Sequence, residues 1–414
     1  MTLTAAATAE DYDVTSDWHV SNPYPFLRRL RQSRPLFYSD NLGAWVLTRY
    51  DDVRAALADN ERFSSDGILT AAHRLEDDVR EMLGSQEAFL GRFVANVDPP
   101  THTRLRQAVA KAFTPRAVAK LGDRYRELMH ESVDLVVADG RADLVAHFAT
   151  FAPARLMGIF IGLPREDEPQ VHAWVHAWFQ LFLARHDPAI SRTLAKSFLD
   201  YLAYVNGLIT DRIAEPRDDF ASLMGRLVDG TPQGLDRLDV VEQISALLLG
   251  GNDTVPNGVG SSIYRLLDGG HWPQVAADAR RIPGAVEEAL RYDGAATGIF
   301  RRAARDIELH GATIPAGSFV FVSQDSAGHD ETVFADPETF DPARANAGQH
   351  MAFGHGIHHC VGAALTRLEM SISIEVLSSR LPSLRIAPGQ EVRHRRSVTG
   401  RGLERLMVEW DERD

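Results

Sequence analysis

Residues 353–362 read Phe-Gly-His-Gly-Ile-His-His-Cys-Val-Gly, and an amphipathic segment from Ala363 to Ser379 follows at once. Glycines allow a backbone to pass close beneath a flat ligand, where a Cβ would collide with it. The loop contains Cys360, the only cysteine of the chain. A thiolate at this point would gain the positive dipole and the backbone N–H groups of a helix N-terminus. The loop therefore predicts that Cys360 holds a ligand from the start of a helix.

From the residues alone, Cys360 has three other interpretations. It can be a small buried hydrophobic residue, which is the usual role of an isolated cysteine. It can join His355 and His359 in a zinc site, although four converging ligands are hard to obtain from one short loop. It can be the nucleophile of a hydrolase with His358 as its base. A single cysteine excludes an internal disulfide and any multi-cysteine metal site.

Composition sets broad limits on partners and location. The 414 residues carry a formal net charge of −13, which disfavours a nucleic-acid partner, and 24% charged with 44% hydrophobic residues is ordinary for a globular protein. The first twenty residues lack a basic start and a long apolar stretch, and no eighteen apolar residues run together. We therefore expect a cytoplasmic protein that binds no membrane.

Helical periodicity dominates the chain, so we expect a mostly α fold. Two regions are instead typical of strand pairs, one at 36–38 with 44–48 and one at 307–309 with 319–322, which predicts a minor β region. No repeat or long linker divides the sequence, so residues 1–414 are expected to form a single domain. The segment 236–267 predicts one helix of roughly 50 Å. Gly250, Gly251 and Pro256 weaken its middle, which often marks function.

Two charged patterns stand on predicted helices. Glu288 and Arg291 are three residues apart and can pair on one helical face. His102 and Arg106 are four apart, so together they can clamp a carboxylate. Taken alone, either pattern is also typical of a solvated surface pair.

Together these motifs resemble the cytochrome P-450 superfamily, and they occur in family order along nearly the full length of the chain. The loop matches the superfamily's heme-binding loop at its Phe, Gly, Gly, His, Cys and Gly positions. The resemblance implies a triangular single domain with a long central helix. It also implies heme b as cofactor, with Cys360 as the axial thiolate, whose electron donation favours O–O cleavage. His358 would bind a heme propionate, and Phe353 would pack beside the sulfur.

The resemblance assigns roles to the charged motifs as well. Glu288 and Arg291 would form a buried structural network with Arg344 of the segment 340–344. His102 and Arg106 would grip one heme propionate. Arg301 would bind the other propionate, with Arg302 as a rival in register.

Residues 250–255, Gly-Gly-Asn-Asp-Thr-Val, resemble the superfamily's oxygen-activation motif. Asp253 and Thr254 keep the carboxylate and the hydroxyl that organise proton delivery. The departures are Gly250 where alanine is common, Val255 where a second threonine is common, and Pro256 inside the expected helix. Despite these departures, we expect Asp253 and Thr254 to deliver protons.

The resemblance implies a soluble bacterial-type monooxygenase that uses O2 and takes electrons from a separate ferredoxin and reductase, and we expect a monomer. The alternatives are a peroxide-driven oxygenase and a heme-thiolate sensor or carrier without turnover; the Asp253–Thr254 pair argues against both. The substrate is expected to be small and largely apolar. The residues expected around it are Trp174, Trp178, Phe179, Phe182, Ala246, Gly250, Ala295, Ala296, Thr297 and Val398. For the four aromatic residues, packing into the core is an equal alternative.

Overall fold

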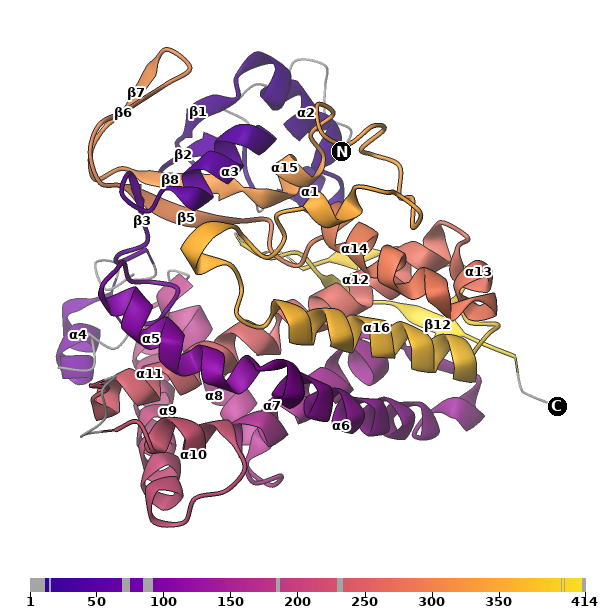
Figure 1. Ribbon diagram of the computed structural model, residues 1–414, viewed down its shortest axis with the longest axis horizontal. Coiled ribbons are helices and arrows are strands. Elements are labelled where there is room, and N and C mark those ends of the chain that lie inside the picture. Colours follow the sequence, from indigo (N-terminus) through magenta and orange to yellow (C-terminus); the bar gives the residue numbers. More distant parts are fainter. Residues whose placement is uncertain are drawn as a thin grey trace. The chain divides into compact units, whose positions relative to one another are not determined.

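The computed structural model describes residues 12–14, 16–68, 75–84, 92–183, 187–228, 234–395, 397 and 399–411. The side chains of residues 179, 182 and 183 are outside this description. The chain divides into two compact units (Figure 1). The first unit comprises residues 1–64, 119–153 and 254–414, and the second comprises residues 65–118 and 154–253. Helices predominate in both, which confirms the mostly α fold with a minor β region.

The described part of the second unit is helical. An aspartate that caps the first backbone N–H groups begins three of its helices, namely α9, α10 and α11. Asp236 and Asp239 form a reciprocal capping box at the start of α11. The helices assigned mainly to this unit are α4 (Asp77–Leu83), α5 (Thr101–Val109), α7 (Phe151–Ile161), α8 (Glu168–Leu183), α9 (Pro188–Ala214), α10 (Phe220–Gly225) and α11 (Arg237–Asn252).

The first unit contains the remaining helices and the described strands. Its long helix α16 lies beside α6 in Figure 1, and the Tyr125 hydroxyl of α6 is 2.8 Å from that of Ser373 on α16. Helix α12 also packs against α16, since a Cβ at Gly258 would be in ordinary van der Waals contact with Met370, 3.4 Å away. The helices are α1 (Asp17–Ser21), α2 (Tyr24–Ser33), α3 (Tyr50–Ala58), most of α6 (Pro115–Asp134), the π-helix η6 (Leu144–Thr150), α12 (Thr254–Asp268), α13 (Trp272–Ala277), α14 (Ile282–Tyr292), α15 (Gln324–Gly328) and α16 (Ala363–Arg380).

A five-stranded sheet organises one part of the first unit. Its order is β1–β2–β8–β5–β3, with β2 and β8 parallel and the other pairs antiparallel. These strands are β1 (Leu36–Ser39), β2 (Ala44–Leu47), β3 (Phe63–Ser64), β5 (Gly298–Ala303) and β8 (Phe319–Ser323). Smaller sheets pair β12 (Met407–Glu409) with β4 (Arg141–Asp143) and β9 (Arg385–Ile386), and β10 (Arg393–His394) with β11 (Leu403–Arg405).

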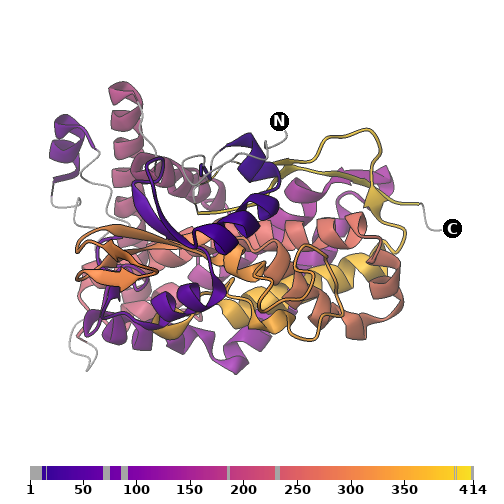
Figure 2. The same cartoon turned by 90° about the horizontal axis from the view of Figure 1, so that it is seen from above.

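The prediction that the segment 307–309 pairs with 319–322 is wrong. The segment 307–309 forms β6 (Ile307–Leu309), but it pairs with β7 (Ala312–Ile314) rather than with 319–322. His310 and Gly311 both have positive φ, so the chain reverses over two residues, as a tight hairpin requires. The resulting hairpin projects from one end of the sheet (Figure 2). Residues 319–322 belong to β8, between β2 and β5.

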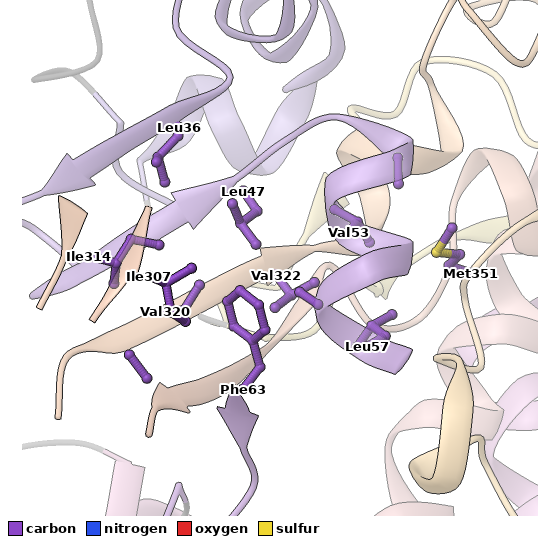
Figure 3. Packing of buried hydrophobic residues seen from close by; sticks show 13 residues of the cluster. Leu36, Leu47, Val53, Leu57, Phe63, Ile307, Ile314, Val320, Val322 and Met351 are labelled. Carbon is purple, nitrogen blue, oxygen red and sulfur yellow. The ribbon is translucent and has the colours of Figure 1, made fainter. Parts of the chain in front are cut away.

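Both faces of the five-stranded sheet are buried. Leu47, Val320 and Val322 face one side and pack under Val53 and Leu57 of α3 (Figure 3). Phe37, Val46 and Phe321 belong to the cluster on the other face, together with Phe26, Leu27 and Leu30 of α2. This alternation follows the two-residue period of a strand. It leaves β5 and β8 as rigid supports for the segments at their ends.

The expected single helix over 236–267 is divided in two. Helix α11 ends at Asn252, and α12 begins at Thr254, with Asp253 between them. Pro256 thereby falls in the first turn of α12, where a missing N–H costs little. Gly251 belongs to the tightly packed end of α11, since a Cβ there would lie 2.1 Å from the Met157 Cε atom.

Among the described residues, one helical stretch is long and apolar enough to cross a membrane. It runs from Leu144 to Ile161, and 56% of it is buried inside the protein, as in the core helix of a soluble protein. This stretch includes His147 and Arg155, so it is not an unbroken apolar run and does not contradict the expectation that no eighteen apolar residues run together.

Candidate functional site

The cysteine loop makes a compact turn before α16. The Cys360 backbone N–H donates to the Phe353 carbonyl at 2.8 Å, which closes the loop on itself. Gly354 and Gly356 have φ of 71° and 73°, values that favour glycine. A Cβ at Gly356 would also lie 2.5 Å from the Leu57 carbonyl oxygen of α3. Cys360 is exposed among the described residues and lies three positions before the first residue of α16.

The side chains of Arg367 and His350 hold the start of this loop. The Arg367 guanidinium of α16 lies over the Phe353 ring, 4.6 Å from its centroid. Glu287 of α14 accepts hydrogen bonds from Arg367 at 2.6 Å and from His350 at 3.2 Å. Burial raises the pKa of Glu287, but these two bonds outweigh it and lower the pKa to about 2. The orientation of Phe353 is thus fixed from α14 and α16 together.

The Glu288 carboxylate is the centre of a buried ionic network. It accepts two bonds of 2.7 Å from Arg291, one of 2.9 Å from the Asp341 N–H, and bonds of 3.2 Å from the Arg344 Nε to each of its oxygens. Both side chains of the Glu288–Arg291 pair are 0% exposed. Arg291 also donates to the carbonyls of Gly328 and Pro337. The network ties α14 to the segments around α15 and residues 337–344.

Arg301 and Arg302 point to opposite sides of β5, because successive strand residues alternate. Arg301 is 3% exposed, and its Nη1 donates to the Phe300 carbonyl at 2.8 Å. The Arg302 guanidinium instead lies 4.9 Å from the centroid of the Phe319 ring. Arg301 is therefore the inward-facing arginine of the two. His358 ends the short helix η9 (Gly356–His358) inside the cysteine loop.

His102 and Arg106 lie on α5 of the second unit, one turn apart. His102 is buried and Arg106 is half-buried. Between them, Arg104 forms an ion pair of 2.6 Å with the buried Asp239 of α11. Their expected contact with a heme propionate stays a prediction.

Asp253 and Thr254 stand at the junction of α11 and α12, and both are exposed among the described residues. Ala246 precedes Gly250 by four residues, so both share one face of α11, and Asp253 directly follows the end of this helix. No described atom comes within 4 Å of the position that a Cβ at Gly250 would take. This face therefore carries small side chains next to an acid and a hydroxyl.

The aromatic residues predicted on α8 differ in environment. Trp178 is 1% exposed and packs against Phe93, Phe198 and Tyr201, with ring centroids 5.6, 6.0 and 5.9 Å away. This favours the core alternative for Trp178. Trp174 is half-buried beside Tyr204. The side chains of Phe179 and Phe182, and all of Val398, lie outside the described residues.

Ala295, Ala296 and Thr297 form a short segment that leads into β5, here called the wall segment. Backbone bonds hold it from two sides: Thr297 N–H donates to Thr399 O, and Arg401 N–H donates to Ala295 O. The Thr297 carbonyl accepts from the Asp325 N–H at 3.0 Å. The segment is thereby fixed between the C-terminal strands and α15.

Asp293, just before the wall segment, is buried and ionic rather than exposed to a pocket. It accepts bonds from Arg265 at 2.5 Å, from Arg401 at 3.2 Å and from the Tyr24 hydroxyl. Burial raises its pKa, but the two guanidinium groups outweigh this and hold the pKa well below its usual range. This network could not be predicted from sequence patterns, because its members lie far apart along the chain.

Sequence reasoning also missed two buried acids. Burial raises the pKa of Glu369 on α16 to about 8. Burial likewise raises the pKa of Glu242 on α11 to about 9, although Glu242 accepts a hydrogen bond from the Arg92 N–H at 2.6 Å. Single acids on helices look like surface residues in a sequence, so no local pattern could have distinguished them.

In the described part of the chain, no group of three or more His, Cys, Asp and Glu side chains could hold a metal ion. The zinc interpretation of His355, His359 and Cys360 finds no support there. Cys360 instead is an exposed cysteine just before the start of a helix. The glycines of its loop have no side chains that would block a ligand. These features fit a flat ligand bound by a single thiolate.

Comparison with known proteins gives the same assignment from separate information. The sequence model of the cytochrome P450 family matches residues 282–387. The chain is 34% identical to the cytochrome P450 monooxygenase PikC of Streptomyces venezuelae, covering 98% of this chain and 95% of that protein. It is also 34% identical to the mycinamicin IV hydroxylase/epoxidase of Micromonospora griseorubida, with 89% of each covered.

Solved structures agree with the fold. The crystal structure of the Acinetobacter radioresistens CYP116B5 heme domain superposes with a TM-score of 0.91 at 27% identity, covering 97% of this chain and 98% of that one. The chain belongs to the cytochrome P450 family. It is an enzyme of the bacterial P450 monooxygenase type, which uses heme iron and dioxygen on small-molecule substrates.

Proposed function

We propose that this chain is a heme b monooxygenase in which Cys360 is the axial ligand of the iron. The observation that carries the proposal is the exposed thiol at the N-terminus of α16, in a loop whose Gly354 and Gly356 have positive φ. The helix dipole and nearby N–H groups favour the thiolate form of such a cysteine. When bound, thiolate-ligated heme supplies the activation of dioxygen and the transfer of one oxygen atom to the substrate.

Basic side chains would anchor the cofactor's two carboxylates. Arg301 carries a fixed positive charge on the inward face of β5, and His358 belongs to the cysteine loop itself. His102 and Arg106 share one face of α5 and offer a second pair of donors. Charge-assisted bonds of this kind are stronger than neutral ones, so each carboxylate would be held at a definite position.

Asp253 and Thr254 would manage protons during turnover. The exposed carboxylate of Asp253 can take a proton from solvent and pass it inward, while the Thr254 hydroxyl can hold a water molecule by donating or accepting a hydrogen bond. Gly250, one turn earlier, leaves space for that water because it has no side chain. General acid–base assistance is typically worth about 10²–10⁴-fold in rate.

The electron donor would be a separate ferredoxin with its reductase, and the chain would act as a cytoplasmic monomer of one domain. The chain passes repeatedly between the two compact units, which supports a single domain because neither unit is one continuous segment. Exposed cations steer encounters with an acidic partner. Arg367 is one-third exposed, but it is already paired with Glu287, and the His350 side chain is only 2% exposed, so His350 is not available for docking.

The substrate would be small and largely apolar, and hydroxylation is the reaction we propose. Ala246, Gly250 and the wall segment each carry small side chains, which suit a compact, largely apolar molecule. The relatives named above include a hydroxylase/epoxidase, which supports insertion of oxygen into carbon frameworks. A spectral binding screen that pairs aromatic compounds with polyhydroxylated ones of similar size tests the substrate class. Binding of only the polar set would refute it.

Labelled dioxygen tests the reaction itself. The purified holoenzyme, supplied with a ferredoxin, its reductase and a nicotinamide donor, should place one atom of the label in the product. The variant Asp253→Asn should slow this by about 10²-fold or more while heme stays bound, and Thr254→Ala should divert electrons into peroxide. Turnover that needs added peroxide and ignores the ferredoxin would favour the peroxide-driven alternative. Heme binding with no product from any donor would favour a carrier.

A further inference from the structure

A small polar cavity lies inside the first unit, behind the wall segment. Gly294 and Ala296 line one side of it, and Gln324 and Asp325 of α15 line the other. Met351, which precedes the cysteine loop, closes it. Apart from Ala296 of the wall segment, the proposed mechanism uses none of the residues named here.

Two side-chain oxygens in this cavity have no partner among the described residues. The Gln324 amide N–H donates to the Met351 carbonyl, but its Oε1 atom accepts no bond. The Asp325 Oδ1 atom accepts from the Ser323 hydroxyl at 2.5 Å and from the Ser326 N–H at 2.7 Å, whereas Oδ2 accepts none. A buried polar atom without a partner is costly, so each calls for an explanation.

The nearby cations do not supply the missing partner. Arg31 donates to Glu331, to Ser326 and to the His329 carbonyl. Arg401 donates to Asp293 and to backbone carbonyls of α1. Of the other charged or titratable groups near Asp325, Arg291 is bound to Glu288, His350 is bound to Glu287, and His329 contacts the Asp325 carbonyl. The buried Tyr12 hydroxyl makes no hydrogen bond to Asp325 and has no partner among the described residues.

Protonation of Asp325 would satisfy both oxygens at once. A carboxylic acid presents an O–H donor where a carboxylate presents only acceptors. Both residues line this polar cavity, so a water there can link that donor to the Gln324 oxygen. Consistent with this, burial raises the pKa of Asp325 to about 6, despite the opposing effects of its bonds from Ser323 and Ser326.

We propose that Asp325 and Gln324 form a proton-dependent latch behind the wall segment. In the closed state the Asp325 acid donates to the Gln324 amide oxygen, and the Asp325 N–H holds the Thr297 carbonyl. On ionisation the two oxygens are both acceptors, so water must enter the cavity and loosen Ala296 and Thr297. This proposal rests on the proposed function, because the latch affects substrate binding only if the wall segment lines the substrate pocket.

Infrared spectroscopy tests the latch without any substrate. The wild-type holoenzyme should show a carboxylic C=O band at pH 5 that disappears by pH 7.5, and Asp325→Asn should lack this band. The buried acids Glu242 and Glu369, with pKa values of about 9 and about 8, are present in both proteins, so the difference between the wild type and Asp325→Asn isolates the band of Asp325. Absence of a titrating band, or its persistence in Asp325→Asn, would overturn the proposal.

Binding of fluconazole, a neutral triazole that ligates heme iron from the pocket side, tests the coupling to the wall. The dissociation constant for the wild type should change at least about fivefold between pH 5 and pH 7.5, the lower range of coupling between sites. Asp325→Asn should be nearly flat, and Asp306→Asn, at an exposed aspartate, should keep the wild-type profile. An Asp325→Asn profile like that of the wild type refutes the latch. Absence of a heme spectral shift in every variant, with the infrared band intact, would instead refute the proposed function.

Discussion

Removing the charge of Glu288 should destabilise the protein more than removing almost any surface charge. In Glu288→Gln the Arg291 guanidinium keeps its bonds to the carbonyls of Gly328 and Pro337 but loses its counter-charge in a site that is 0% exposed. Breaking one side of a buried ion pair typically costs about 3–5 kcal/mol, because it leaves an uncompensated buried charge. Arg344 loses its ion pair with Glu288 at the same time.

Urea unfolding of the holoenzyme, followed by circular dichroism, measures this cost as a lowered midpoint with an unchanged slope. The matched control is Glu391→Gln, because Glu391 pairs with Arg393 at 2.8 Å while both side chains are about 70% exposed. Exposed pairs contribute about 0–1 kcal/mol, so this control should lie close to the wild type. A loss below about 1 kcal/mol in Glu288→Gln would refute the reasoning that the network stabilises the fold through a buried charge.

Other perturbations test other parts of the structure. Glu369→Gln should be more stable than the wild type at pH 8.5 but not at pH 5. The pKa of Glu369 is about 8 in the folded protein against an ordinary 4.5, so the wild type loses about 1.4 kcal/mol of stability for each pH unit between these two values. Equal pH profiles of the two proteins in urea unfolding would contradict this. Asp293→Asn should be less stable than the wild type at neutral pH, and this difference should shrink as pH falls below about 4. The reason is that the ion pairs that lower the pKa of Asp293 stabilise the fold only while its carboxylate is ionised. A difference in stability that stays constant with pH would count against these ion pairs. Gly328→Ala should lower the thermal midpoint, because its Cβ would lie 2.5 Å from the Arg291 carbonyl oxygen, and overpacking costs about 1–3 kcal/mol; an unchanged midpoint would show that the backbone yields. Reduction by a ferredoxin should slow as salt rises, because exposed charges are screened beyond about 8–10 Å; a rate independent of salt would indicate an apolar docking face.

Local patterns predicted the elements that depend on neighbours in sequence. The hairpin of β1 and β2, the helix after Cys360 and the contacts among Glu288, Arg291 and Arg344 could all be expected, because spacing or a complete motif encodes them. The partner of β6 could not be predicted in this way. The tight turn at Gly311 lets β6 pair with β7, which is closer in sequence than β8. Helix α11 ends two residues before Thr254, because Pro256 fits the first turn of a new helix and not the interior of an existing one.

Long-range burial was beyond sequence reasoning. The network around Asp293 brings together residues from four distant segments, namely Tyr24, Arg265, Asp293 and Arg401. No pattern within one of these segments indicates that it contacts the others. Asp325 likewise looks like an ordinary turn residue until the fold encloses it. Aromatic spacing on α8 left core and pocket roles equally open, and only the contacts of Trp178 with Phe198 and Tyr201 favour the core.

The central claim is that Cys360 ligates the heme iron, and the absorption spectrum of the reduced, CO-bound protein tests it most directly. Thiolate ligation predicts a Soret band shifted strongly to the red of that of a histidine-ligated heme. The variant Cys360→His should keep α16 folded, because the replaced side chain is exposed, and should lose the red-shifted band. A wild type without that band, or a Cys360→His variant that retains it, would contradict the account.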